Sequence, residues 1–148
     1  MAGAFRRVKD RRLSEVKQIT VPNDLAAAKR PEELILGEVA RCGYSQNIAF
    51  AIKLALEEAM TNAFRHGNKC DPAKNIHVRY DITNEKIEIE VCDEGEGFSP
   101  DTVPDPTLPE YIDRPHGRGI MLMRAYLDEV SYHCNGTAVR LVKINRQE

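Results

Sequence analysis

The sequence predicts an α+β fold: a two-layer sandwich with a mixed or antiparallel sheet and its helices packed on one face. Residues 45–67 carry apolar side chains at helical spacing, whereas residues 75–93 and 129–144 each alternate as a β-hairpin does. The length of 148 residues suffices for one core and not for two. We therefore expect a basic leader over residues 1–15 and a single domain over 16–148.

The first third of the chain is expected to hold one strand and one helical segment. Residues 16–21 alternate as in a short strand, and residues 22–24, Pro-Asn-Asp, end it and offer an N-cap. Residues 25–42 have a helical pattern in which Pro31 breaks or restarts the helix, and Gly43 marks its end.

The strongest predicted element is a helix that opens at Ser45 and closes at Gly67. Its apolar residues recur every three or four positions, which is typical of a helix with one buried face. They are Ile48, Ile52, Ala55, Leu56, Ala59, Met60, Ala63 and Phe64.

The second half of the chain is expected to form two hairpins with a loop between them. Asn84–Glu85 joins the strands of the first hairpin, and Asn135–Gly136 is a strong turn pair for the second. Residues 98–116 contain five prolines and fit no regular element, which is typical of a functional or mobile loop. Residues 119–127 fit a short helix.

Bulk composition excludes several classes of function. A net charge of -2 would not attract nucleic acid, so direct DNA or RNA binding is not expected. No apolar stretch is long enough to span a bilayer, and no apolar segment of a signal peptide follows the basic N-terminus. The four cysteines are widely spaced, so the expected setting is the reducing cytoplasm.

A first candidate site lies on the long helix, where Glu58 and Asn62 share one face one turn apart. Their face is otherwise small or apolar, so burying an acid and an amide there costs desolvation unless a ligand pairs with them. A hydrated magnesium ion would do so, because Mg²⁺ prefers oxygen ligands. The helix alone fits a blander interpretation better, with Glu58 at a solvated edge and Asn62 a satisfied core amide.

Two further candidate sites are glycine-rich turns. In D-E-G-E-G-F, Asp93 ends an apolar strand and can accept a hydrogen bond from an amino group such as that of adenine; Gly95 and Gly97 allow a ligand to approach. Residues 117–119, Gly-Arg-Gly, precede the predicted short helix, whose free N–H groups could bind phosphate. Each motif alone is weak, since a simple turn or a hinge would have the same residues.

A metal centre built on histidine and cysteine is not expected. His66 and Cys70 are four apart, but Gly67 ends the helix between them and no second pair completes a tetrahedral site. Cys42, Cys92 and Cys134 lie in apolar stretches and are interpreted as inert core residues.

Taken together and in this order, the motifs resemble the GHKL (Bergerat-type) ATP-binding fold of gyrase, histidine kinases and mismatch-repair ATPases. The resemblance is narrower still for E-A-M-T-N-A-F-R-H-G-N, D-E-G-E-G-F, H-G-R-G-I-M-L-M-R-A-Y-L-D-E-V and G-T-A-V-R-L-V-K. These segments look like those of the bacterial anti-sigma factor serine-protein kinases, over about residues 16–143.

The resemblance implies a role for each candidate residue. Glu58 would be the general base and Asn62 the magnesium ligand, while Asp93 would bind the adenine amine. Residues 98–116 would form a lid over the phosphates. The remaining nucleotide contacts would come from His66, Gly95, Gly97, Gly117, Arg118, Gly119 and Thr137.

The resemblance also implies the function. The protein would be an ATP- and Mg²⁺-dependent serine/threonine-protein kinase that phosphorylates an anti-sigma factor antagonist. It would also sequester a sigma factor, and so regulate transcription, as a homodimer. The alternative is an ATP-gated binding module that captures a protein partner without phosphoryl transfer, because binding and transfer use nearly the same residues.

Overall fold

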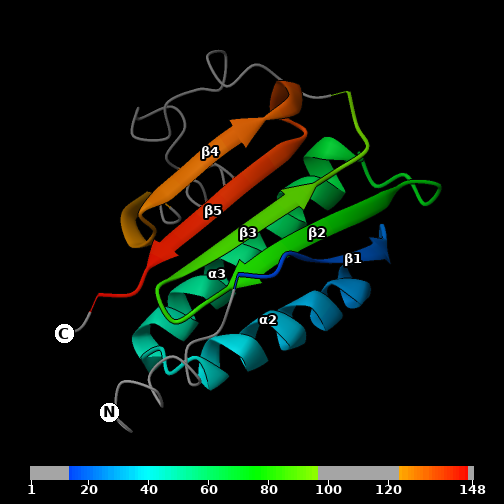
Figure 1. The fold of residues 1–148 in the computed structure, drawn as a ribbon. Helices are drawn as coiled ribbons and strands as arrows, with labels where there is room; N and C mark the ends of the chain where they lie inside the picture. Colours follow the sequence, from blue (N-terminus) through cyan, green and yellow to red (C-terminus); the bar gives the residue numbers. More distant parts are fainter. Residues whose placement is uncertain (1–13, 97–123, 147–148) are drawn as a thin grey trace, which may run out of the picture.

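Five antiparallel strands form one sheet in the order β1-β2-β3-β5-β4 (Figure 1). The computed structural model describes residues 14–96 and 124–146. The strands are β1 (Lys17–Pro22), β2 (Asn75–Ile82), β3 (Lys86–Cys92), β4 (Glu129–His133) and β5 (Ala138–Ile144). The predicted hairpins are confirmed, and the sheet is antiparallel at every pairing among the described residues.

The first helical segment begins and ends where the sequence signals place it. Asp24 accepts a hydrogen bond from the N–H of Ala26 (2.8 Å) and caps the 3₁₀ turn Leu25–Ala28, after which α2 (Lys29–Arg41) continues. Pro31 therefore lies in the first turn of α2, where its missing N–H costs nothing. Gly43 adopts φ +78° and ends this segment.

The long helix α3 (Gln46–Asn62) begins as predicted and ends differently. The Ser45 hydroxyl accepts a hydrogen bond from the N–H of Ile48 (3.2 Å). Beyond Asn62 the helix widens into a π-turn, η2 (Ala63–Gly67), closed by a bond from the N–H of Asn68 to the carbonyl of Ala63 (2.7 Å). Such π-turns are frequent at functional sites.

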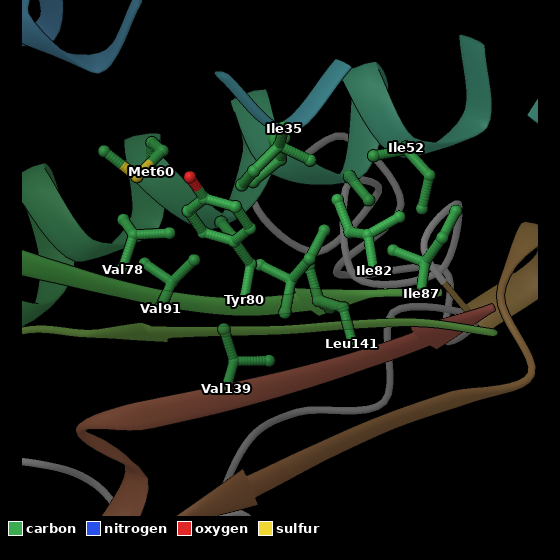
Figure 2. Close-up of a cluster of buried hydrophobic side chains, with 14 of the residues drawn as sticks. Ile35, Ile52, Met60, Val78, Tyr80, Ile82, Ile87, Val91, Val139 and Leu141 are labelled. Carbon is green, nitrogen blue, oxygen red and sulfur yellow. The ribbon is translucent and has the colours of Figure 1, made fainter. Parts of the chain in front are cut away.

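The core lies between the sheet and the two helices on one of its faces (Figures 1 and 2). Figure 2 shows Ile35 of α2 and Ile52 and Met60 of α3 pointing at side chains that line the strands. Ile35, Ile52, Val78 and Ile89 are each at most 1% exposed. This predicted arrangement is confirmed, and it fixes α3 across the sheet by apolar packing.

The other face of the sheet is charged. Arg79 of β2 pairs with Glu90 of β3, and Arg140 of β5 bridges Glu88 (2.8 Å) and Glu129 (3.3 Å).

Among the described helices, none combines the length and apolar character needed to cross a membrane.

Several predictions concern residues outside the described ranges. These predictions concern most of the leader, the loop 98–116, Gly97 and the Gly117–Gly119 turn. Of the leader, Ser14 and Glu15 are described, and both hydrogen-bond the Asp81 carboxylate, Glu15 through its N–H at 3.0 Å. Of the predicted short helix over residues 119–127, residues 124–127 are described; residues 124–126 are helical and Leu127 lies in a bend.

Candidate active site

The last turn of α3 carries Glu58 and Asn62 in the environment that the sequence suggested. Glu58 is half-buried, and burial raises the pKa of its carboxyl group above the usual range. The Oδ1 atom of Asn62 is buried, and no donor among the described residues reaches it. Asn62 is therefore not a satisfied core amide, because its oxygen lacks the partner that buried polar atoms normally have.

An unpartnered buried oxygen fits an oxygen-preferring cation. Its burial without a hydrogen bond costs about 1–3 kcal/mol, which a ligand bound there would recover. An amide oxygen such as that of Asn62 is among the oxygen ligands that Mg²⁺ accepts. The residues present thus fit the metal that the sequence resemblance implies.

Tyr132 of the edge strand β4 is also near Glu58. Burial raises the pKa of the Tyr132 hydroxyl, the positive charge of Arg124 opposes that shift, and the negative charge of Glu58 adds to it. Glu58 and Arg124 therefore each lie close enough to the Tyr132 hydroxyl for their charges to act on it. Tyr132 and Arg124 were not predicted from the sequence as site residues, since neither belongs to a glycine-rich motif.

The π-turn meets the turn that follows β3, and this contact leaves no room for side chains at two glycines. A Cβ added to Gly95 would lie 2.6 Å from the carbonyl carbon of Gly67 and closer still to its oxygen. A Cβ added to Gly67 would lie 2.8 Å from the Cβ of Asp93 and would collide with its carboxylate. Two motifs nearly thirty residues apart in sequence are thus in direct backbone contact.

Asp93 is held at its main chain and at one carboxylate oxygen. Its N–H donates to the carbonyl of Thr137 (2.8 Å), and its Oδ1 accepts from the N–H of Gly95 (2.8 Å). Burial raises the pKa of this carboxyl group, an effect that the Gly95 N–H and the charge of Lys74 oppose. A carboxylate can accept several hydrogen bonds, so Asp93 retains capacity for a ligand amine.

Thr137 lies beside Asp93, immediately before β5. Besides accepting from Asp93, it donates from its hydroxyl to the carbonyl of Cys134 (2.9 Å) in the turn before the strand. The structure thus brings Gly67, Asp93, Gly95 and Thr137 together at one end of the sheet. His66 is exposed on the π-turn.

One cysteine prediction is wrong. Cys42 is buried, but Cys134 is exposed and adopts φ +54° in the turn between β4 and β5. The reason is that Cys134 lies in the turn between the two strands, where its direct neighbours His133 and Asn135 are polar and no core position is available. Cys92 is partly buried, and burial together with the charge of Glu90 raises its thiol pKa to about 11.

Asn68, which follows the H-G pair of the helix end, was not predicted from the sequence as a site residue. Asn68 is 0% exposed, and its side-chain oxygen accepts from the N–H of Glu94 (2.7 Å). It was visible as the last letter of E-A-M-T-N-A-F-R-H-G-N, but a lone polar residue after a helix usually faces solvent.

Comparison with known proteins identifies the family. Residues 21–143 match the histidine kinase-like ATPase domain. The chain is 31% identical to the serine-protein kinase RsbW of Bacillus licheniformis over 122 residues, covering 76% of this chain and 74% of the relative. It is 29% identical to RsbW of Listeria innocua over 133 residues, or 80% of this chain and 85% of that protein.

A solved structure shares the fold. It contains the RsbU and RsbW domains of a Mycobacterium tuberculosis protein and superimposes with a TM-score of 0.62 at 18% identity. The match covers 90% of this chain and 33% of the longer one. On the strength of the matched domain and the curated relatives, the chain belongs to the histidine kinase-like ATPase domain family and, within it, to the RsbW serine-protein kinases.

Proposed function

We propose that this protein transfers the γ-phosphoryl group of ATP to a serine or threonine hydroxyl of an anti-sigma factor antagonist, and that it also sequesters a sigma factor, acting as a homodimer. The observation that carries the catalytic part is the buried, unpartnered Oδ1 of Asn62, one helical turn from a half-buried carboxylate at Glu58. The names of the relatives, serine-protein kinases, support the same chemistry.

In this proposal each side chain has one task. Asp93 accepts a hydrogen bond from the exocyclic amine of adenine, and Thr137 and Gly95 border the base. Gly97, Gly117, Arg118, Gly119 and His66 complete the nucleotide contacts, with residues 98–116 as the lid. Asn62 holds Mg²⁺, which when bound neutralises charge on the phosphate oxygens.

Glu58 acts on the acceptor hydroxyl. Its carboxylate takes the hydroxyl proton as the hydroxyl oxygen forms a bond to the γ-phosphorus, and the bond from that phosphorus to the bridging oxygen of ADP breaks. A carboxylate whose pKa is raised by burial is a stronger base than one in water. The phosphorylated antagonist and ADP are the products.

The proposal is tested with γ-labelled ATP, Mg²⁺ and candidate antagonist proteins from the same genome. We expect label on one antagonist, and loss of the label when its acceptor serine or threonine is replaced by alanine. If the protein binds Mg-ATP and a partner but labels no antagonist, the ATP-gated binding module becomes the better account.

A further inference from the structure

Asn68 is the most deeply buried polar residue among those the structure describes, and its side chain joins three segments of the chain. Its Nδ2 donates to the carbonyl of Asn75 at the start of β2 (2.9 Å) and to Oδ1 of Asn23 after β1 (3.2 Å). Its Oδ1 accepts from the N–H of Glu94 (2.7 Å) in the turn after β3. One carboxamide therefore ties the turn after β3 to the start of β2 and to the segment that follows β1.

The bond to Glu94 determines how Asp93 is presented. The N–H of Asp93 is fixed by Thr137 on one side, and the next N–H along the chain is fixed by Asn68 on the other. Fixing both peptide units that flank a residue fixes its Cα–Cβ direction. The Asp93 carboxylate then has little freedom except rotation about its own side-chain bonds.

The neighbours of Asn68 show why an asparagine is required. Aspartate would keep the acceptor for Glu94 but would face two carbonyl oxygens without a proton to donate. Alanine or leucine would leave the N–H of Glu94 and the carbonyl of Asn75 without partners in a buried site. Asn68 also follows Gly67, whose missing side chain lets the Asp93 turn approach the π-turn.

We propose that Asn68 is a positioning residue for base recognition, which holds the Asp93 carboxylate in the direction that selects adenine. This inference rests on the proposed function, in which Asp93 binds the adenine amine. Asn68 itself does not touch the nucleotide in this proposal; it acts through the backbone of Glu94.

Asn23 offers a matched control. It is buried (7% exposed), it hydrogen-bonds Asn68, and its Nδ2 donates to the carbonyl of Asp71 (3.0 Å). Neither of these hydrogen bonds reaches the Asp93–Gly95 turn. A purely structural role for the network predicts similar effects of alanine at both asparagines, whereas a positioning role predicts that only Asn68 changes nucleotide recognition.

The experiment measures the affinities of the full chain and of Asn68→Ala and Asn23→Ala for Mg-ATP and Mg-GTP by calorimetry, with urea unfolding of each protein beside it. We expect Asn68→Ala to weaken ATP binding about tenfold, because the hydrogen bond that orients the Asp93 carboxylate is lost. The ratio of the GTP to the ATP dissociation constant should shift toward one. Asn23→Ala should lose stability but keep both the ATP affinity and the ratio within about twofold.

A second measurement covers the case in which Asn68→Ala does not fold. In the wild-type chain, amide exchange followed by NMR should show the N–H of Glu94 protected at least about tenfold relative to an unstructured peptide, although the Glu94 side chain is exposed. An unprotected Glu94 amide, or an Asn68→Ala protein with wild-type affinity and wild-type base ratio, would overturn the inference. A wild type that binds no ATP would overturn the proposed function instead.

Discussion

The carboxylate of Asp93 is the group on which base selection depends in this account. Asp93→Asn keeps an oxygen for the N–H of Gly95 but loses the charge that strengthens a hydrogen bond from adenine. We expect the dissociation constant for ATP to rise about 10- to 100-fold, with the unfolding midpoint little changed. Calorimetry with Mg-ATP measures it.

Glu94→Gln is the matched control for Asp93→Asn, because it makes the same acid-to-amide change one residue later. The Glu94 carboxylate points away from Asp93, toward the N–H of Asn75 (3.0 Å) and Nε2 of His77 (2.7 Å). The ATP affinity of Glu94→Gln should match that of the wild type. Equal effects of the two substitutions would remove Asp93 from its assigned role.

Glu58 is expected to matter for transfer and not for binding. Glu58→Gln preserves size and removes the base, so single-turnover phosphoryl transfer should slow roughly a hundredfold while the ATP affinity stays the same. Glu57→Gln, at the exposed neighbouring position, is the control and should transfer phosphate at the wild-type rate. Unchanged transfer by Glu58→Gln would contradict the assignment.

The raised pKa of Glu58 gives two pH effects with opposite consequences for activity and stability. A base works when deprotonated, so transfer should fall as the pH is lowered through a pKa above 4.5, and Glu58→Gln should lack that decline. The pKa of Glu58 is higher in the folded state than in the unfolded state. Ionisation of Glu58 therefore lowers the free energy of unfolding as the pH rises through the folded-state pKa. Glu58→Gln should therefore be more stable than the wild type at pH 7, as urea unfolding would measure.

At the scale of elements, the contact between the π-turn and the turn after β3 requires two glycines. Gly95→Ala would push a methyl group into the backbone of Gly67, which cannot move as a flexible side chain could. We expect loss of ATP binding and an unfolding free energy lower by about 1–3 kcal/mol, the usual cost of overpacking. Calorimetry and urea unfolding measure the two effects.

Gly37→Ala, in the middle of α2, is the contrasting substitution. Its Cβ would lie 3.5 Å from the nearest atom, a guanidinium nitrogen of Arg41, which is ordinary van der Waals contact. Helix propensity should then raise the unfolding free energy by about 0.5–1 kcal/mol and leave ATP binding unchanged. Retained ATP affinity in Gly95→Ala would show that the two turns need not touch for binding.

The elements that the sequence predicted are those with local signals. Ser45, Gly43 and the Asn84–Glu85 turn each act on neighbouring residues, so their positions could be inferred without the fold. The π-turn could not, because Ala63–Gly67 continues the pattern of an ordinary helix. The insertion of β5 between β3 and β4 depends on pairing between distant strands, which no local pattern encodes.

The same distinction applies to the candidate site. Glu58, Asn62 and Asp93 stood out because acidic and amide groups interrupt apolar stretches, and glycine-rich turns mark close approaches. Asn68 and Tyr132 did not stand out, because their importance comes from partners that only the folded chain brings near. The exposed Cys134 was misassigned because apolar residues in the flanking strands do not guarantee burial of a residue in the turn between them.

On the scale of the whole molecule, the apolar layer between α2, α3 and the sheet supports a site that is itself destabilising. Asn62 buries an oxygen without a partner, and Glu58 buries a charge. Natural proteins tolerate such groups where function needs them, and removing them then stabilises the fold at the expense of activity. This trade-off distinguishes a ligand site from an ordinary polar residue in the core.

The most direct test measures the thermal unfolding midpoint of Asn62→Leu with and without Mg-ATP, beside that of the wild type. Asn47→Leu is the control, because Asn47 is exposed in the first turn of α3. Without ligand, Asn62→Leu should be more stable than the wild type by about 1 kcal/mol, because the unpartnered oxygen is gone. Mg-ATP should raise the midpoint of the wild type and of Asn47→Leu, and leave that of Asn62→Leu unchanged. An Asn62→Leu protein that Mg-ATP stabilises as much as the wild type would contradict the account.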